Sequence, residues 1–231
     1  MIAHELRGLM EDDNPRDVHE PTSNIQKSYD TVAREYAEEI HTELAGKPFD
    51  REALDRFAKR VGRGRVCDLG CGPGQIARYL RDRGVNVFGL DLSAGMLAQA
   101  RRLNPGIPFV QGSMLALGLG PETLDGIAAF YSIIHIPRSR VVAALKEMRR
   151  VLKAGGWLLI TFHLGTEDAH HEELFGRPVH LDVAYFTTLE MSGYLQAAGL
   201  RVEEVRERDP YAPEIEYQSR RGYIFAAKPS G

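Results

Sequence analysis

The feature that most constrains the fold of this chain is a glycine-rich turn between an apolar run and a helical pattern. The run Val66–Leu69 leads into Gly70, Gly72 and Gly74, and apolar residues then recur at helical spacing over 76–80. A strand that enters a helix through such a turn lets backbone N–H groups approach a ligand, because no Cβ stands in the way. The stretch therefore predicts a ligand at the helix N-terminus, at the carboxyl end of the strand.

The residues around the turn favour one class of nucleotide over another. The dinucleotide fingerprint G-x-G-x-x-G needs a small residue at position 75, where the chain has Gln75. Asp68 would also place a carboxylate beside a pyrophosphate, which is unfavourable. A carboxylate suits a ligand with positive charge near the turn, and S-adenosylmethionine carries a sulfonium and an ammonium group. A nicotinamide-dependent oxidoreductase of Rossmann type is therefore the weaker alternative.

A second carboxylate follows the next apolar segment. Residues 85–90 read as a strand that ends in Asp91. A carboxylate at the tip of the second strand is placed to accept hydrogen bonds from two ribose hydroxyls. Nicotinamide and adenosylmethionine proteins share this device, so Asp91 indicates an adenosine nucleotide without distinguishing between them.

Together these residues resemble a known family. The stretch Asp68-Leu-Gly-Cys-Gly-Pro-Gly74 is similar to the first motif of the class I S-adenosylmethionine-dependent methyltransferases, and the resemblance extends over about residues 24–228. It implies S-adenosyl-L-methionine as cofactor and S-adenosyl-L-homocysteine as product. The methyl group would move to oxygen or nitrogen of a small-molecule acceptor. A regulator that binds S-adenosylmethionine without catalysis is a further alternative.

Strand-like and helix-like segments alternate along the chain, which predicts a doubly wound parallel sheet. The segment 123–130 is apolar throughout, as expected of a strand buried on both faces. With the resemblance added, we expect an α/β, Rossmann-like sheet of seven strands. It would be mostly parallel, with an antiparallel C-terminal strand and helices on both faces.

The same patterns divide the chain into regions. We expect a flexible N-terminal arm over 1–22 and a single methyltransferase domain over 23–231. The resemblance places N-terminal helices, residues 23–61, over the cofactor. The segment 163–186 interrupts the alternation and is long for a connection, which predicts a lid or substrate insertion over the carboxyl ends of the strands.

The resemblance also implies which residues contact the cofactor. Tyr29, preferred to Tyr36, would contact the methionine end, and Met96 would lie against the adenine or simply pack in the core. Ser113 stands where the family usually has an acidic residue that bonds the adenine amino group, so this contact departs from the pattern. The full set is Tyr29, Asp68, Gly70, Cys71, Gly72, Asp91, Leu92, Met96, Ser113, Met114, Phe130 and Tyr131.

Two histidines are candidates for a general base, because a histidine titrates near neutral pH and could take a proton from a hydroxyl acceptor. His135 follows the fourth predicted strand by five residues, and His163 lies at the tip of the fifth. We slightly prefer His163, since a side chain at a strand end points into the crevice. Each could instead bond the lid or the backbone, and many family members use no protein base.

Other features define what the chain is not expected to bind. His170 and His171 are adjacent, and without an H-x-x-x-H spacing we expect a solvated face and no metal. The net charge is −3 and no basic run exceeds two residues, which disfavours nucleic acid. No apolar run approaches the roughly 20 residues of a membrane span. Two cysteines are too few for an expected disulfide framework, and the N-terminus has no apolar signal core, so we expect a cytoplasmic protein. We also expect a monomer or homodimer.

Overall fold

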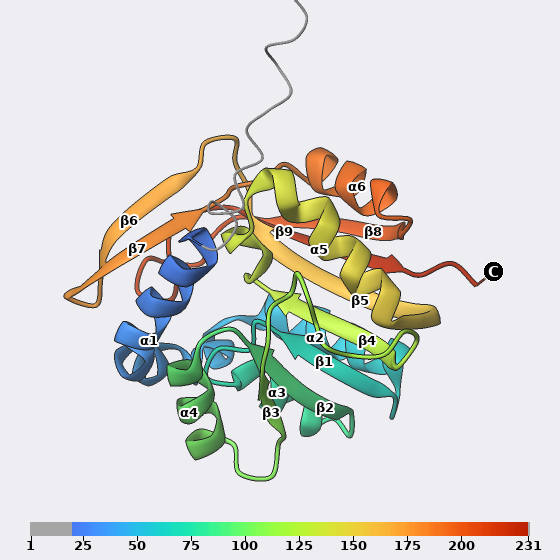
Figure 1. Ribbon diagram of the computed structural model, residues 1–231, viewed down its shortest axis with the longest axis horizontal. Coiled ribbons are helices and arrows are strands. Elements are labelled where there is room, and N and C mark those ends of the chain that lie inside the picture. Colours follow the sequence, from blue (N-terminus) through green and yellow to red (C-terminus); the bar gives the residue numbers. More distant parts are fainter. Residues whose placement is uncertain (1–19, 231) are drawn as a thin grey trace, which may run out of the picture.

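The computed structural model describes residues 20–230 and is built on a seven-stranded sheet with the order β3-β2-β1-β4-β5-β9-β8 (Figure 1). Strands β1 to β5 pair in parallel, and β9 runs antiparallel to both of its neighbours. The predicted fold is therefore confirmed. The strands are β1 Arg65–Leu69, β2 Asn86–Asp91, β3 Phe109–Gln111, β4 Leu124–Phe130, β5 Leu152–His163, β8 Arg201–Arg208 and β9 Arg221–Ala227.

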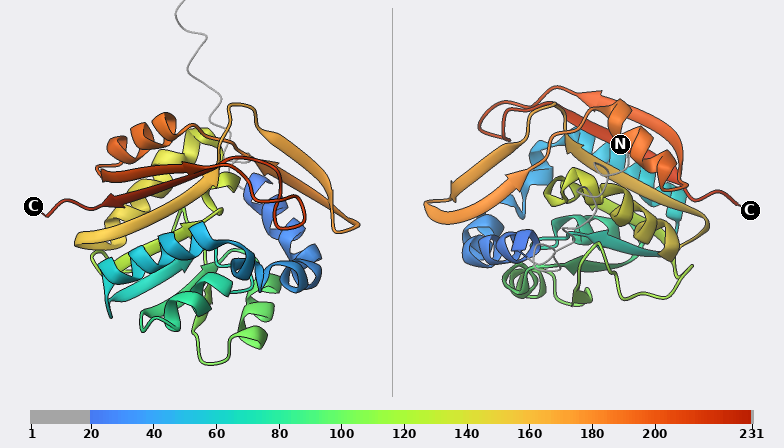
Figure 2. Two further views of the ribbon diagram at one scale, coloured as in Figure 1. Left: turned by 180° about the vertical axis from the view of Figure 1, so that it is seen from behind. Right: turned by 45° about the horizontal axis from the view of Figure 1, so that its top comes forward.

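Helices cover both faces of the sheet (Figures 1 and 2). One apolar core joins α5 and α6 to one face, and a second joins α2, α3 and α4 to the other. Each of these helices buries one apolar stripe, as the spacing of its apolar residues along the sequence predicts. The helical elements are α1 Glu20–Ile40, η1 Glu43–Gly46, α2 Pro48–Val61, α3 Gln75–Arg81, α4 Ala94–Leu103, η2 Ile133–His135, α5 Arg138–Val151 and α6 Thr188–Ala197.

The strand order reverses at β1, which pairs with β2 on one side and with β4 on the other. Connections on the two sides of this point diverge, so the carboxyl ends of β1 and β4 border a crevice. The glycine-rich turn leaves β1 at this position. The topology therefore places the predicted ligand site where an open α/β sheet ordinarily binds its ligand.

The predicted lid contains a two-stranded hairpin beside α1, formed by β6 Ala169–Leu174 and β7 Arg177–Val183 (Figure 1). Its turn residues Phe175 and Gly176 have φ of +53° and +70°, as a tight hairpin turn requires. The hydroxyl of Ser28 in α1 accepts from His180 N at 2.8 Å and donates to His180 O at 3.2 Å. The hairpin is thus fastened to the first helix rather than to the main sheet.

Two boundaries differ from the sequence analysis. Helix α1 begins at Glu20, inside the predicted arm of 1–22, and the rest of that arm, residues 1–19, lies outside the described residues. The apolar spacing over 141–152 predicts a helix that Gly155-Gly156 would stop, but α5 ends earlier, at Val151, and β5 begins at the next residue. The register between β4 and β5 shifts here, so the glycines bulge out of the strand pairing.

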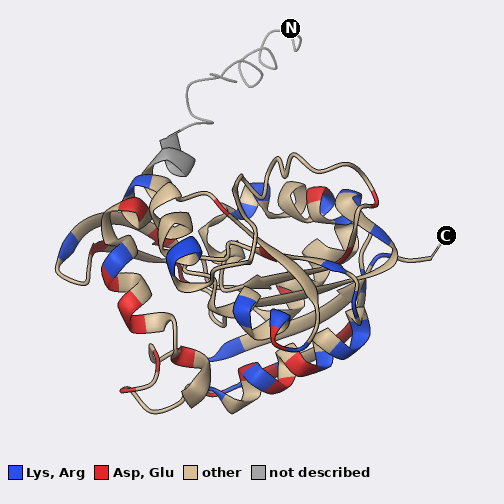
Figure 3. Ribbon diagram, turned by 90° about the horizontal axis from the view of Figure 1, so that it is seen from below, with Lys and Arg blue, Asp and Glu red and all other residues tan. Residues whose placement is uncertain are grey.

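Within residues 20–230, no helix combines the length and the apolar character that a membrane span needs. Along the helices in Figure 3, ribbon segments coloured for Lys and Arg are interspersed with segments coloured for Asp and Glu. Residues of the two charge signs are thus mixed along these helices.

Candidate functional site

A cavity of about 930 Å³ opens at the carboxyl ends of the strands. This volume is at the upper end of the range of about 300–1,000 Å³ that is usual for small-molecule sites. Its wall runs from the glycine-rich turn past α1 to the loop 213–217. Of the fourteen site residues that the sequence predicted, twelve line it: Tyr29, Gly70, Gly72, Asp91, Leu92, Met96, Ser113, Met114, Phe130, Tyr131, His135 and His163.

The turn after β1 requires glycine for two reasons. Gly70 has φ of +72°, and a Cβ there would lie 2.3 Å from Cβ of Ser132. Gly72 has φ of +50° and lines the cavity, and a Cβ there would meet only Tyr36, at 3.9 Å, among the described residues. Gly70 N donates to Leu90 O at 2.7 Å, which fixes the turn against β2. The turn is thus held rigid and leaves its backbone open to a ligand.

Asp68 and Cys71 are the two predicted residues that do not line the cavity. The Asp68 carboxyl is 1% exposed and accepts a hydrogen bond from Ala77 N at 2.9 Å, so it supports the first turn of α3 from behind. Burial raises the pKa of Asp68 to about 8, so the group is neutral at pH 7. In this structure the Asp68 carboxyl lies behind the turn and not in the cavity wall, so its contact with a positively charged ligand stays a prediction. Cys71 is buried in the core against Gly89 of β2.

A different polar group occupies the cavity wall beside the turn. Gln75 lines the cavity, and its Nε2 donates to Glu43 Oε1 at 3.0 Å. Its buried Oε1 has no hydrogen-bond partner among the described residues. A buried carbonyl without a partner is costly, and a donor group on a ligand would satisfy it. The sequence analysis treated Gln75 only as evidence against a dinucleotide and missed this role.

Asp91 ends β2 with its carboxylate at the cavity wall. One oxygen accepts from Gly72 N at 2.8 Å and the other from Ser93 N at 2.9 Å. Burial raises the pKa of Asp91, and these backbone hydrogen bonds oppose the increase. Each carboxylate oxygen has a second lone pair. The carboxylate could therefore accept from two neighbouring hydroxyls, and the ribose contact stays a prediction.

Helix α1 is tied to the same end of the cavity by Asp30, a residue that the sequence analysis did not single out. Asp30 Oδ1 accepts from Ser93 Oγ at 2.6 Å and from Gly95 N at 2.8 Å, while Ser93 Oγ accepts from Met96 N at 3.0 Å. Asp30 therefore caps α4 from another helix. No local pattern signals this, because the partners are more than 60 positions apart.

Tyr29 and His135 meet at the centre of the cavity. The Tyr29 hydroxyl lies 2.6 Å from His135 Nε2, and His135 Nδ1 lies 3.0 Å from Asp182 O. A carbonyl only accepts, so Nδ1 carries the proton and Nε2 accepts from the Tyr29 hydroxyl. Burial lowers the pKa of His135 and raises the pKa of Tyr29, which keeps both groups neutral.

His163 lies at the far end of the cavity, at the end of β5. Its Nδ1 is 2.6 Å from Ser219 Oγ, and its ring centroid is 5.5 Å from that of Tyr131 and 5.4 Å from that of Tyr185. Burial, together with the nearby charge of Arg221, lowers the pKa of His163 to about 3. The ring is therefore uncharged throughout the physiological range.

Tyr131 has a strained backbone at the edge between the two halves of the cavity. Its φ is +48°, in the left-handed region that costs a non-glycine residue about 1–3 kcal/mol. Its N–H donates to Thr161 Oγ1 at 2.9 Å, and its hydroxyl lies 3.1 Å from Asp50 Oδ1 and 2.8 Å from the Tyr223 hydroxyl. Hydrogen bonds at both ends of the residue thus hold the ring in the cavity wall.

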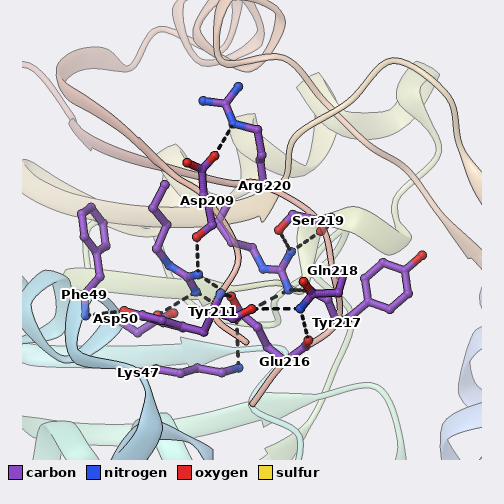
Figure 4. A network of polar contacts seen from close by, with 12 residues as sticks. Lys47, Phe49, Asp50, Asp209, Tyr211, Glu216, Tyr217, Gln218, Ser219 and Arg220 are labelled. Carbon is purple, nitrogen blue, oxygen red and sulfur yellow. Dashed lines mark hydrogen bonds and ion pairs between the residues drawn. The ribbon is translucent and has the colours of Figure 1, made fainter. Parts of the chain in front are cut away.

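A buried network of charges supports this end of the cavity (Figure 4). Arg208 binds Glu216 and lies 3.0 Å from Asp50 Oδ2. Burial acts to raise the pKa of Glu216, but its hydrogen bonds with Arg208 outweigh this and hold the value at about 2. Glu216 is also 3.6 Å from Lys47 and 3.5 Å from Arg221. Sequence reasoning missed the network because its members are dispersed from 43 to 221.

The predicted lid contributes little of the wall: within 163–186, His163 and Phe175 are the lining residues. On the hairpin, His170 Nδ1 is 2.7 Å from Asp182 Oδ1. Among the described residues, no group of three His, Cys, Asp or Glu side chains is arranged to hold a metal ion. The hairpin therefore braces α1 and His135 more than it covers the cavity.

Comparison with known proteins gives the following matches. Residues 66–156, from β1 into β5, match the family model of a methyltransferase domain. The chain is 31% identical over 157 residues to a demethylmenaquinone methyltransferase of Beutenbergia cavernae, covering 66% of this chain and 63% of that protein. It is 37% identical over 121 residues to a malonyl-[acyl-carrier protein] O-methyltransferase of Enterobacter lignolyticus, covering 52% and 47%. The chain thus matches less than two thirds of the length of either relative.

Among solved structures, the fold is similar to that of 1,6-didemethyltoxoflavin-N1-methyltransferase of Burkholderia thailandensis, determined with 1,6-didemethyltoxoflavin and S-adenosylhomocysteine bound. The TM-score is 0.67 at 18% sequence identity, and the similarity covers 95% of this chain and 92% of that one. At this identity the likeness concerns the fold.

Proposed function

We propose that the chain is a class I S-adenosylmethionine-dependent methyltransferase that transfers a methyl group from S-adenosylmethionine to oxygen or nitrogen of a small molecule. The observation that carries this proposal is the shared wall of one cavity. Gly72 and Asp91, joined by a hydrogen bond of 2.8 Å, would form its nucleoside end, and Tyr29 and His163 line the same cavity. The volume is sufficient for a cofactor and a second small molecule side by side.

The chemical groups along the cavity wall match the hydrogen-bonding and apolar parts of the cofactor. The Asp91 carboxylate would accept hydrogen bonds from the ribose hydroxyls, and Leu92 and Met96 would flank the adenine beside Ser113. At the other end, the unpartnered Oε1 of Gln75 would receive a donor from the methionine moiety, in place of the neutral Asp68. When bound, the cofactor supplies a methyl group already activated by its sulfonium.

The protein's own contribution is position and proton transfer. Holding the nucleophile in line within a closed cavity supplies about 7–11 kcal/mol in well-oriented systems. For a hydroxyl acceptor, the proton would pass to the Tyr29 oxygen as the Tyr29 proton moves to Nε2 of His135 across 2.6 Å. Such base assistance is worth roughly 10²–10⁴ in rate. This choice of His135 replaces the preference for His163 in the sequence analysis.

We further propose that the protein works in the cytoplasm, as a monomer or homodimer and without nucleic acid. Two observations support this. Cys67 and Cys71 are both free and buried, as is usual in a reducing compartment, and Figure 3 shows Lys and Arg positions interspersed with Asp and Glu positions along the helices.

Calorimetric titration with S-adenosylmethionine, S-adenosylhomocysteine and NADH tests the proposal. We expect micromolar binding of the first two and none of NADH. Binding of NADH alone would contradict the assignment and favour an oxidoreductase. Incubation with cofactor labelled on the methyl group and a panel of hydroxyl and amine compounds then tests turnover. Binding with no transfer to any compound would favour a regulatory role.

A further inference from the structure

The two histidines that line the cavity have different hydrogen-bond partners, and these partners assign them opposite tautomers. His135 Nδ1 faces a backbone carbonyl, Asp182 O, at 3.0 Å, so this nitrogen carries the proton and Nε2 holds a lone pair. The Nε2 of His135 is therefore the atom that receives a proton.

At His163 the partner is a hydroxyl whose own bonding is constrained. A guanidinium group only donates hydrogen bonds. Arg221 donates to Ser219 Oγ, so one lone pair of that oxygen is occupied. The oxygen keeps a second lone pair, but the hydroxyl hydrogen also needs an acceptor, and among the described residues His163 Nδ1 at 2.6 Å is the one within reach; the hydrogen is therefore assigned to this contact. With Nδ1 accepting, the neutral ring carries its proton on Nε2.

The Nε2 side of His163 has no hydrogen-bond partner among residues 24–230, and the ring lines the cavity. Two further lining rings stand around it: the centroid of Tyr131 is 5.5 Å away and that of Tyr217 is 6.1 Å away. A donor thus stands between aromatic rings at the far end of the cavity.

The buried charged groups at this end are paired with one another. Lys47 Nζ lies 2.6 Å from Glu43 and 3.6 Å from Glu216, and Arg221 lies 3.5 Å from Glu216. The side chains of Lys47, Glu216 and Arg221 are at most 8% exposed. Glu214 also lines the cavity, but it is exposed to solvent. An ionised group placed against the buried charges would lose its hydration without gaining a free counter-charge, which is unfavourable. The buried part of this end therefore suits an uncharged molecule.

We propose that His163 determines specificity by donating a hydrogen bond from Nε2 to an uncharged oxygen of the methyl acceptor, such as a ketone or quinone carbonyl. Tyr131 and Tyr217 receive a planar ring beside it. The inference rests on the proposed function, because it describes the second substrate of that reaction. It gives the two histidines different tasks: His135 takes a proton, and His163 recognises the molecule that loses it.

The tautomers can be read without any ligand, from long-range ¹H–¹⁵N spectra of the histidine-labelled protein at neutral pH. The variants H163Q and H135Q assign the signals. We expect His163 to carry its proton on Nε2 and His135 on Nδ1. The variant S219A removes the hydroxyl donor and should convert His163 to a mixture of tautomers. A His163 ring protonated on Nδ1, or on both nitrogens, would overturn the inference.

Binding of matched probes to the complex with S-adenosylhomocysteine tests the acceptor class. The probes are 2-acetylnaphthalene, 2-naphthoate and 2-naphthylmethylamine, which share one ring system and differ in charge. We expect the ketone to bind best, and H163A to weaken it by about three- to tenfold, the value of one neutral hydrogen bond. H163Q, whose amide can donate, should retain most of the affinity.

The two proposals fail in different ways. Absence of S-adenosylhomocysteine binding would contradict the proposed function. Normal binding of S-adenosylhomocysteine, with the naphthoate or the amine preferred to the ketone, would contradict only the role given to His163. An unchanged ketone affinity in H163A would do the same.

Discussion

The hydroxyl of Tyr29 lies 2.6 Å from Nε2 of His135, although the two residues are 106 positions apart. This contact joins the first described helix to the segment after β4. The other nitrogen of His135 bonds Asp182 O in the hairpin. Three segments that are distant in the sequence thus converge on one imidazole at the centre of the cavity.

Removing the Tyr29 hydroxyl should separate proton transfer from cofactor binding. In Y29F we expect transfer to a hydroxyl acceptor to fall by about 10²-fold, because the path from the acceptor to His135 is broken. Affinity for S-adenosylhomocysteine should change little. Y36F is the matched control: Tyr36 packs edge-on at 5.6 Å from Tyr29, and its hydroxyl has no hydrogen bond among the described residues. Equal losses of rate in both variants, measured by single turnover, would contradict the relay.

The two aspartates near the turn should respond differently to neutralisation. D91N should weaken S-adenosylhomocysteine binding by about 1.5–3 kcal/mol, or about 10- to 150-fold, since a charged hydrogen-bond partner of the ribose is lost. D68N should change the affinity by less than about twofold, because Asp68 is already neutral and lies behind the turn. Calorimetry on both variants measures this. A larger loss in D68N would restore Asp68 as a cofactor contact.

The raised pKa of Asp68 also predicts that the stability of the protein depends on pH. Its pKa is raised from 3.8 to about 8 by burial, so the folded state holds a proton that the unfolded state releases. The contribution to stability is full below pH 3.8 and is lost as the pH rises through 8. The free energy of unfolding of the native protein should therefore fall relative to D68N between these values, by up to about 1.4 kcal/mol per pH unit. Urea titrations of both proteins across this pH range measure the difference. Free energies of unfolding that change with pH in parallel in the native protein and in D68N would contradict the prediction.

The buried network should contribute far more to stability than an exposed one. R208M leaves Asp50 and Glu216 buried without their shared partner, which should cost about 3–5 kcal/mol in the free energy of unfolding. R220A removes a pair of ion contacts to Glu207 and Asp209 at the surface and should cost less than about 1 kcal/mol. Chemical denaturation compares the two. Similar costs would mean that the network is not structurally important.

Two glycines with positive φ should separate steric from conformational effects. G84A adds a Cβ with no heavy atom within 4 Å at φ of +81°, so only the left-handed conformation is penalised, by about 1–2 kcal/mol. G70A adds a clash with Ser132 at 2.3 Å and should cost about 3 kcal/mol or more. Because Gly70 lines the cavity, cofactor binding should fall only in G70A. Thermal melts with and without S-adenosylhomocysteine report both quantities.

Local patterns predicted the parallel sheet, the glycine-rich turn and Asp91, and the family resemblance supplied the seven strands and most of the residues of the cavity wall. The alternation of apolar runs and helices, the glycines after β1 and the carboxylate at Asp91 are each encoded within short stretches, because every strand end delivers its next residues to the same edge. That is why twelve of the fourteen predicted site residues line one cavity.

The features that the sequence did not indicate depend on the direction of a side chain or on contacts between residues far apart in the chain. Asp68 precedes Gly70 by two residues, yet its side chain points behind the turn to Ala77 N, and a motif does not specify which face a side chain takes. The pairing of Arg208 with Asp50 and Glu216 joins α2, β8 and a loop. Such contacts arise only when the elements pack against one another, so the spacing of residues along the chain does not predict them.

The position of β9 has a consequence for synthesis of the protein. All seven residues of β9 are buried, and the strand lies between β5 and β8. Its first residue, Arg221, also closes one end of the cavity. A nascent chain that still lacks this strand would leave an unpaired edge along β5, a template for aggregation. The ligand site and the protection of that edge thus both require β9 to be in place.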